Sequence, residues 1–529
     1  MATAGRRASD SSATPSSRGP GVVPRIAIID VGSNTAKLIA LEYRAGHSWR
    51  QLDELRSVVR LSSGLDEGGV LRPRPYARGL AALRTFASYA AAVGVDHLVA
   101  TATSAVRDAC NGHEFVAAVR EMGIDLRVLD GVEEARIGAL AVVNGLDVRD
   151  AVSLDLGGGS FQLAEIADRR WRRGGSWPLG AVRAQERFLR GDPPKVKSLR
   201  ALRAAARAAV EAFAGGAPPP ATFVGLGGTV RNLANVHQKR VGYPLDLLHG
   251  YRLPADDLRA LADELVVLDA ARRAEVPGLN RDRADIIAAG ATVVAEVAAA
   301  LGVEALHVSG QGLREGLFYP FLLPESRGHL LDDVRGFSVL NLMRQYHDDP
   351  AHNGHVRVLA LALFDGLRPW HPFGDAEREL LGHAAWIHDI GMAVDYYRHE
   401  HHGLALTLGR ALSGFSHREQ VLLALLVRYH RKGNPGADGF GALLEPGDGE
   451  RLRLLAGVLR LAEYLERGKA QRVTGVEVRA EGDAIVVRAR SEGDVHVEVE
   501  AANLRRDLLA QALGRAVSVV GRDDVDGAA

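Results

Sequence analysis

The feature of this sequence that most constrains its fold is a short unit that occurs twice. In residues 25–40, and again in residues 152–163, an apolar segment ends in an aspartate, a glycine-containing turn follows, and a second apolar segment begins. This pattern is typical of a β-hairpin, and glycines at its tip let backbone N–H groups approach an anion closely. One such hairpin is often only structural. Two copies, about half a domain apart, predict a duplicated fold in which two phosphate-binding loops face one cleft.

Residues near these turns point to the same chemistry. Asp155 ends an apolar segment, where a carboxylate is placed to hold Mg²⁺, usually through the waters that this ion retains. A further glycine turn, at Gly227 and Gly228, leads into a predicted helix. Backbone N–H groups at a helix N-terminus bind anions, so Gly228 and Thr229 join the predicted phosphate site.

Composition limits the classes of protein to consider. The 529 residues are enough for three or four domains. The net charge is zero, so neither nucleic acid nor membrane is an expected partner, and a polyanion must be held by a local patch. The single Cys110 excludes internal disulfides and Cys-based zinc sites, which predicts a cytoplasmic protein. Residues 1–24 predict a disordered tail rather than a signal peptide, and no apolar run reaches the ~18 residues of a membrane span.

The order of predicted elements divides the first part of the chain into two lobes. Strand and helix patterns alternate in residues 25–150, which predicts an α/β lobe. A second α/β lobe is predicted in residues 151–325. Within it, residues 183–207 are rich in Arg and Lys, which fits either a solvated helix face or a track for a polyanion.

Segments between residues 25 and 325 resemble, in the same order, motifs of the exopolyphosphatase/guanosine pentaphosphatase (Ppx/GppA) family. They are IDVGSNTAKL, ATSAVRDA, GVEEAR, LDLGGGS, WPLGAVRAQERFL, GLGGTVRNLA, HGYRL, RADIIAAGA and VSGQGLREG. The resemblance implies two actin-like ATPase (ribonuclease H-like) lobes around a phosphate cleft. It also implies Mg²⁺-dependent, processive hydrolysis of the terminal phosphate of inorganic polyphosphate, and a homodimer.

Carried over onto this sequence, the resemblance makes Glu134, in GVEEAR, the general base that orients and deprotonates the attacking water. Asp30 and Asp155 become the metal-associated carboxylates, and Mg²⁺ and amide dipoles offset the charge of the terminal phosphate. Outside this context, Glu134 would be interpreted as a solvated first-turn acid favoured by the helix dipole. Besides Gly228 and Thr229, the phosphate-binding residues are then Ser33, Asn34, Thr35, Gly157, Gly158, Gly159 and Ser160.

One departure from the family pattern affects the metal site. The family usually has Thr and Glu after the serine of the GGGS turn, where this sequence has Phe161 and Gln162. Gln cannot carry a negative charge or give a carboxylate to a metal. We therefore expect lower metal affinity or turnover, or a neighbouring group that substitutes for the missing acid.

Histidines and acids recur on the predicted helices of residues 326–470. A lone His on an apolar helix is usually a core residue, but imidazole and carboxylate together suit a divalent metal. This region resembles the HD phosphohydrolase helical domain that many family members carry, often in degenerate form, and in which an Asp usually stands at position 463. The resemblance implies a second divalent metal held by His355, His388, Asp389 and Glu463, with His399, His402 and His430 as candidate ligands of a further ion. Residues 471–529 predict a small α/β cap.

The favoured function is exopolyphosphatase, a phosphoanhydride hydrolase. Guanosine pentaphosphate (pppGpp) presents the same terminal phosphoanhydride, so a pppGpp 5′-phosphohydrolase is an open alternative. A regulator that binds polyphosphate or guanosine tetraphosphate (ppGpp) without turnover would agree with Gln162. An HD-domain phosphohydrolase would place the chemistry at His388 and Asp389. A sugar kinase on the same fold is disfavoured by the Glu134 motif.

Overall fold

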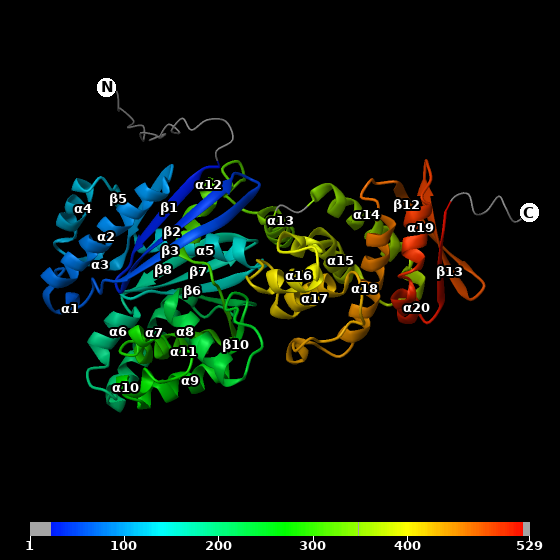
Figure 1. The fold of residues 1–529 in the computed structure, drawn as a ribbon. Coiled ribbons are helices and arrows are strands. Elements are labelled where there is room, and N and C mark those ends of the chain that lie inside the picture. Colours follow the sequence, from blue (N-terminus) through cyan, green and yellow to red (C-terminus); the bar gives the residue numbers. More distant parts are fainter. Residues whose placement is uncertain (1–22, 347–348, 522–529) are drawn as a thin grey trace, which may run out of the picture.

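The structure, a computed structural model, describes residues 23–346 and 349–521. Residues 1–22, most of the predicted disordered tail, lie outside the described residues. The molecule is elongated: two α/β lobes lie at one end, a helical region follows, and a small sheet lies at the other end (Figure 1). Among the described residues, no helix is both long and apolar enough to cross a membrane.

The first lobe is built on a mixed five-stranded sheet with the order β3-β2-β1-β4-β5. Strands β1, β2 and β3 are antiparallel neighbours, whereas β1, β4 and β5 run parallel. Because side chains alternate along a strand, Ile28 and Ile29 of β1 belong to two different hydrophobic cores, one on each face of the sheet. The strands are β1 (Arg25–Val31), β2 (Thr35–Arg44), β3 (Ser48–Val58), β4 (His97–Ala102) and β5 (Leu126–Val128).

The second lobe repeats this topology in a six-stranded sheet with the order β10-β11-β9-β6-β7-β8. Strands β6, β7 and β8 are antiparallel, β6, β9 and β11 run parallel, and β10 adds an antiparallel edge. The strand order therefore agrees with the duplication that the two hairpins predict. The strands are β6 (Ala151–Leu156), β7 (Phe161–Ala167), β8 (Arg170–Trp177), β9 (Phe223–Leu226), β10 (Arg252–Pro254) and β11 (Ala305–Val308).

Two helices cross between the lobes. Helix α5 (Gly131–Gly145) precedes the second lobe in sequence but packs on β7 and β8, where Ala139 shares a core with Val224. Helix α12 (Leu313–Leu322) follows the second lobe but packs on β1 and β2, with Phe318 in the core beneath them. Each sheet is thus covered on one face by a helix from the other half of the chain.

The other helices of the lobes lie on the outer faces of the two sheets (Figure 1). In the first lobe they are α1 (Leu65–Gly68), α2 (Pro73–Val93), α3 (Ser104–Asp108) and α4 (Gly112–Glu121). In the second lobe they are α6 (Ala181–Phe188), α7 (Val196–Ala214), α8 (Gly227–Arg240), α9 (Ala255–Val267), α10 (Ala270–Arg273), the 3₁₀ turn η1 (Arg281–Arg283) and α11 (Ile287–Leu301).

The basic segment of residues 183–207 is divided between α6 and α7. Arg183 is buried and donates to Asp108 Oδ2 over 2.9 Å. Arg207 donates to Glu296 Oε2 over 2.7 Å. These two guanidinium groups already have acidic partners and are not free to bind a polyanion, and both interpretations of the whole segment stay predictions.

The helical region begins at α13 and packs around one large hydrophobic core. Its helices are α13 (Val334–Gln345), α14 (Pro350–Gly366), α15 (Asp375–Ile387), α16 (His399–Leu408), α17 (His417–Tyr429) and α18 (Asp448–Leu465). Short 3₁₀ turns join them: η2 (Arg368–Trp370), η3 (Ile390–Ala393) and η4 (Gly441–Leu443).

The chain ends in a three-stranded sheet with the order β12-β13-β14. Its residues Ile485 and Val487 belong to the same core as α14 and α18, so this sheet is packed onto the helices. The elements are β12 (Val473–Glu481), β13 (Ala484–Ser491), α19 (His496–Asn503), α20 (Asp507–Leu513) and β14 (Ala516–Val520). The pattern predicts a single helix over 501–513. The structure has a break instead, because the Asn503 side chain pairs with the backbone N–H and carbonyl of Val519.

Candidate active site

Three acids that lie far apart in the sequence line one cavity between the two lobes. Asp30 lies near the end of β1, Asp155 near the end of β6, and Glu134 in the first turn of α5. All three border the same cavity. The two hairpins and the start of helix α5 therefore meet at one cavity, as the sequence predicts for a shared phosphate cleft.

The position of Glu134 follows from how α5 begins. Asp130 caps the helix, because its carboxylate accepts from the backbone N–H groups of Val132 and Glu133 over 2.9 and 2.8 Å. Glu134 then follows in the first turn and is buried. Arg107 Nη1 lies 3.4 Å from its carboxylate and 2.8 Å from the carbonyl of Leu129, so the guanidinium is held in place beside the acid.

The two glycine turns pack directly against each other. Ser33 Oγ lies 2.9 Å from Ser104 Oγ. A Cβ atom at Gly159 would lie 2.4 Å from Ser104 Oγ and 2.7 Å from Ser33 Oγ, closer than atoms can approach. Glycine at 159 is therefore required for the turn of the second lobe to rest on the turn of the first.

Most of the predicted phosphate-binding residues line the cavity. They are Ser33, Asn34, Thr35, Gly157, Gly158 and Gly228. Gly159, Ser160 and Thr229 are absent from its lining and lie behind it. Gly159 contacts the two serines, Ser160 Oγ bonds Gln162 Nε2 over 2.8 Å, and Thr229 is buried against Gly290. These three residues support the loops rather than face the cavity.

Burial and mutual repulsion make the acids hard to ionise in the absence of a cation. Burial, followed by the charge of Asp155, raises the pKa of Glu134 to about 8, against the opposing effect of Arg107. Burial and the charge of Asp30 raise the pKa of Asp155 to about 6. Burial likewise raises the pKa of Asp30. A divalent cation would offset this repulsion, and two carboxylate oxygens are donors that suit a hard ion such as Mg²⁺.

Four cationic side chains also line the cavity, although no local sequence pattern predicts a role for them. They are Lys37, Arg231, Arg283 and Arg314. Burial, then Arg231 and Arg314, lowers the pKa of Lys37 to about 7. Burial and Arg231 lower the pKa of Arg283 to about 10. Cations this crowded repel one another, so the cavity favours a ligand with several negative charges.

The signal for these cations was present in the motif segments. Lys37 lies in IDVGSNTAKL, Arg231 in GLGGTVRNLA and Arg314 in VSGQGLREG. Nothing in their spacing shows that they converge, because they come from β2, α8 and α12. Thr103, from ATSAVRDA, also lines the cavity, as its place after a predicted strand indicates, because sites of α/β folds gather at the C-terminal ends of strands.

Gln162, the departure from the family pattern, is buried behind the GGGS turn. Its Nε2 donates to Ser160 Oγ over 2.8 Å and to Ser176 Oγ over 3.0 Å. Its Oε1 has no hydrogen-bond partner among the described residues. In the β6–β7 hairpin Gln162 lies directly opposite Asp155, so an acid here would stand next to the predicted metal carboxylate.

The helical region brings a second group of ionisable residues together. His388, Asp389 and Glu463 are buried side by side, but the fourth member is His352 rather than the predicted His355. His355 lies about one turn further along α14, where its Nε2 approaches the Val473 carbonyl at 2.8 Å. His355 is therefore replaced by His352 in the candidate metal site.

The three histidines proposed for a further ion are only partly brought together. His399 and His430 lie beside Asp389, whereas His402 is outside the group. Glu463, one methylene longer than the expected Asp, still places its Oε2 3.0 Å from His388 Nε2 and 3.1 Å from His352 Nε2.

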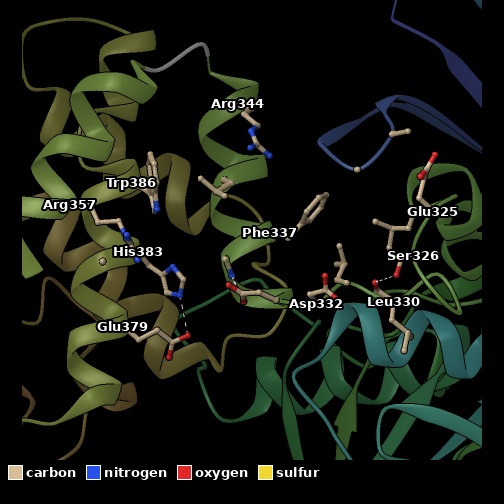
Figure 2. A pocket seen from close by; sticks show the side chains of 18 of the residues that line it. Glu325, Ser326, Leu330, Asp332, Phe337, Arg344, Arg357, Glu379, His383 and Trp386 are labelled. Atoms are coloured by element: carbon tan, nitrogen blue, oxygen red, sulfur yellow. Dashed lines mark hydrogen bonds and ion pairs between the residues drawn. The ribbon is translucent and has the colours of Figure 1, made fainter.

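A larger cavity of about 980 Å³ separates the end of the second lobe from the helical region. Figure 2 shows Phe337 and Leu330 on one side of it and Trp386 and His383 on the other. His383 bonds Glu379 Oε1 over 3.2 Å. The acids and glycine turns of the cleft are absent from its lining, so this cavity is separate from the candidate active site.

Both the two-lobed part of the chain and the region that follows it are similar to phosphatases of one family. Residues 41–325 match the Ppx/GppA phosphatase family, and residues 334–512 match domain III of Ppx/GppA phosphatases. Exopolyphosphatase 1 of Mycobacterium tuberculosis is 33% identical over 340 residues, which cover 62% of this chain and 96% of that protein. Exopolyphosphatase 1 of Mycobacterium leprae is 33% identical over 337 residues, which cover 60% of this chain and 96% of that protein.

Solved structures share the two-lobed part. The Aquifex aeolicus member of the Ppx/GppA family superimposes with a TM-score of 0.51 at 27% identity, covering 58% of this chain and 100% of that one. An exopolyphosphatase from Cytophaga hutchinsonii superimposes with a TM-score of 0.53 at 25% identity, covering 56% of this chain and 97% of that one. The expected actin-like fold of the lobes is thereby confirmed. The HD-type description of the helical region stays a prediction.

Proposed function

This chain belongs to the Ppx/GppA phosphatase family, and from that we propose that it is an exopolyphosphatase. It hydrolyses a phosphoanhydride: water attacks the terminal phosphorus of polyphosphate, the bond to the bridging oxygen breaks, and orthophosphate and a chain shorter by one phosphate are released. The observation that carries this proposal is the convergence of Asp30, Glu134 and Asp155 on one cavity that is also lined by cations.

Each group of the cavity has a role that follows from its chemistry. Glu134, once ionised, accepts a proton from the attacking water and orients it. Arg107, 3.4 Å away, favours the ionised carboxylate. Asp30 and Asp155 would hold Mg²⁺, which supplies positive charge next to the terminal phosphate when bound. The cationic side chains, with backbone N–H groups of the glycine turns, balance the charge on the phosphate oxygens.

The charge of the cavity supports substrate binding that depends on the length of the polyphosphate chain. Each phosphate of the chain brings negative charge, and Lys37, Arg231 and Arg283 line the cavity together with the acids. pppGpp carries a terminal phosphoanhydride too and is the competing substrate. The homodimer and the cytoplasmic location stay predictions of the sequence.

Phosphate release tests the proposal when it is measured side by side on long polyphosphate, short polyphosphate and pppGpp with Mg²⁺. We expect release from long polyphosphate that is lost in Glu134→Gln, a change that keeps the shape of the side chain and removes the base. The matched control is Glu133→Gln, on the same helical turn, which should retain activity. Phosphate release from pppGpp alone would show that the nucleotide is the substrate. Activity that survives Glu134→Gln but is lost in His388→Ala would place the active site in the helical region.

A further inference from the structure

The HGYRL segment of the second lobe contacts the far end of the helix that carries Glu134. His249, the first residue of this segment, is buried and does not line the cavity between the lobes. Its Nε2 lies 2.8 Å from the carbonyl oxygen of Gly145, the last residue of α5. The last carbonyl groups of a helix have no partner within the helix, so His249 supplies one from outside.

The hydrogen bonds of His249 fix which ring nitrogen carries the proton. A carbonyl oxygen can only accept, so Nε2 is protonated and donates to Gly145. Nδ1 accepts from the backbone N–H of Gly310 over 3.0 Å. Both nitrogens are thus used by the neutral ring, and burial lowers the pKa of His249, which favours that form. One side chain therefore joins the end of α5 to the loop that leads into α12.

The helical region reaches the same point through His417, the first residue of α17. His417 is buried, and its Nε2 donates to the carbonyl oxygen of His249 over 3.0 Å. Nδ1 of the neutral ring then accepts from the hydroxyl of Tyr243 over 2.9 Å. The backbone N–H of Gly414 adds a second donor to the Gly145 carbonyl, at 3.1 Å. The helical region thus holds the end of α5 directly through Gly414 and, by way of His249, through His417.

The segments that meet here pack without spare room. A Cβ atom at Gly145 would lie 3.0 Å from Gln311 Cδ and 3.2 Å from His249 Cε1. A Cβ atom at Gly310 would lie 2.9 Å from His249 Cβ. Close-packed groups transmit a displacement instead of absorbing it. A shift of the loop before α17 would therefore move the end of α5.

Helix α5 carries such a shift to the cleft, because Glu134 and Gly145 belong to one continuous helix. At ~1.5 Å per residue they lie roughly 16 Å apart along its axis. The start of the helix is held by the Asp130 cap and by Arg107 beside Glu134. A catalytic group that is displaced by ~1 Å can lose about 100-fold in rate, so the fixing of both helix ends has a catalytic consequence.

We propose that His249 and His417 are positioning residues for Glu134. Neither contacts the substrate; they hold the end of α5 so that the helix presents the Glu134 carboxylate to the cleft. The inference rests on the proposed function, because it concerns the general base of that reaction. It makes the geometry of the base depend on the helical region. A ligand or partner that shifts residues 413–417 would change kcat without entering the cleft.

Two substitutions of His417 separate its hydrogen bond to His249 from its packing. Gln places an amide N–H group near the position of the imidazole Nε2, whereas Asn is one methylene shorter and does not reach the His249 carbonyl. His417→Asn should lower kcat for long polyphosphate about 10-fold. KM should stay unchanged, because the substrate contacts are intact and only the alignment of the base is lost. His417→Gln should retain most of kcat.

The matched control is His371→Asn. His371 Nε2 lies 3.1 Å from the Phe364 carbonyl, and Nδ1 accepts from the Phe373 N–H over 3.3 Å. This histidine has the same bonding pattern as His417, but both of these partners belong to the helical region. We expect His371→Asn to lower Tm and to leave kcat unchanged. A merely structural role of His417 would give the same result in His417→Asn.

A milder variant keeps the test valid if His417→Asn folds poorly. Tyr243→Phe removes only the hydroxyl that donates to His417 Nδ1. The imidazole then loses the partner that orients it, and kcat should fall about 2-fold, the equivalent of a fraction of one hydrogen bond. Steady-state phosphate release measures kcat and KM for each variant.

Amide hydrogen exchange of α5 gives a measurement that does not depend on activity. His417→Asn should speed exchange in residues 131–145, and His371→Asn should not. The inference is overturned if this exchange is unchanged in His417→Asn, if His417→Asn and Tyr243→Phe keep the kcat of the unmodified protein, or if His417→Gln loses as much kcat as His417→Asn. If the unmodified protein releases no phosphate from polyphosphate or pppGpp, the proposed function fails. Exchange then still decides whether the helical region holds α5.

Discussion

Asp30 of β1 lies directly opposite Lys37 of β2 in the first hairpin. Directly opposed residues of an antiparallel pair project to the same face of the sheet, and both line the cavity between the lobes. One hairpin therefore supplies an acid suited to a metal ion and a cation suited to a phosphate. Burial and neighbouring guanidinium groups lower the pKa of Lys37 to about 7, and a bound polyanion would favour its charged form.

Lys37→Met should lower kcat/KM for long polyphosphate. The loss of one charge-assisted contact costs about 1.5–3 kcal/mol, so kcat/KM for long polyphosphate should fall roughly 10- to 100-fold. The matched control is Lys239→Met, whose ammonium is exposed and pairs with Asp246 on the surface. Steady-state phosphate release measures both. An unchanged kcat/KM in Lys37→Met would show that this lysine does not contact substrate.

Mg²⁺ should stabilise the protein more as the pH rises. The folded pKa values of Asp30, Asp155 and Glu134 are raised, to about 6 for Asp155 and about 8 for Glu134. The metal-free folded state then binds more protons than the unfolded chain, so these groups make stability fall as the pH rises from their unfolded values toward about 8. A bound cation removes the cause, because it favours the ionised carboxylates.

Thermal unfolding with and without Mg²⁺ across this pH range checks the prediction. The rise in Tm caused by Mg²⁺ should be small at acidic pH and grow toward pH values near the folded pKa of Glu134. It should disappear in Asp30→Asn with Asp155→Asn. An increment that does not change with pH would mean that Mg²⁺ binds elsewhere.

Gly159→Ala should disrupt the contact between the two turns. The added Cβ would lie 2.4 Å from Ser104 Oγ, and such overpacking costs about 1–3 kcal/mol. We expect a loss of kcat of at least ~10-fold, because the loop that carries Gly157 and Gly158 must move. The control is Gly475→Ala in β12, where a Cβ would meet open space.

A second variant identifies the cause of the Gly159→Ala defect. Ser104→Ala removes the hydroxyl that the new Cβ would strike, so Gly159→Ala with Ser104→Ala should recover part of kcat. Coupling between the two changes is expected because they are in contact. If the effects were simply additive, the damage would come from another neighbour.

Gln162→Glu should lower the Mg²⁺ concentration needed for half-maximal phosphate release. The new carboxylate would lie opposite Asp155 in the hairpin and could accept hydrogen bonds from the hydroxyls of Ser160 and Ser176, which Gln162 Nε2 now contacts. Gln162→Met removes the amide without adding charge and separates the two effects. An identical Mg²⁺ dependence in the unmodified protein, Gln162→Glu and Gln162→Met would show that residue 162 does not affect metal binding.

Local sequence patterns are sufficient to predict only part of the cleft. The acids at the two hairpin tips, Asp30 and Asp155, were predictable because each lies in a local pattern of strand and turn, whereas Glu134 was identified only through the resemblance of GVEEAR to the family motif. Two of the cations were not predictable, because Arg231 of α8 and Arg283 of η1 reach the cavity from elements that only the tertiary fold brings together.

In the helical region, sequence spacing alone does not decide which histidine of α14 joins the candidate metal site. His352 and His355 lie three residues apart on α14, so sequence spacing places both near one face of the helix. Only the packing of α14 against α18 and the last sheet decides that His352 approaches Glu463 while His355 approaches the Val473 carbonyl. The break at Asn503 has the same origin, because its partner on β14 is distant in sequence.

The crossing of α5 has a consequence for any hinge motion of the enzyme. This helix packs on β7 and β8, so in such a motion we expect Glu134 to stay with the half that carries Asp155, while its contacts with Arg107 and helix α12 change. Opening the cleft would separate the Glu134 carboxylate from Asp30 and keep it beside Asp155. Neither half, produced by itself, would possess a working centre.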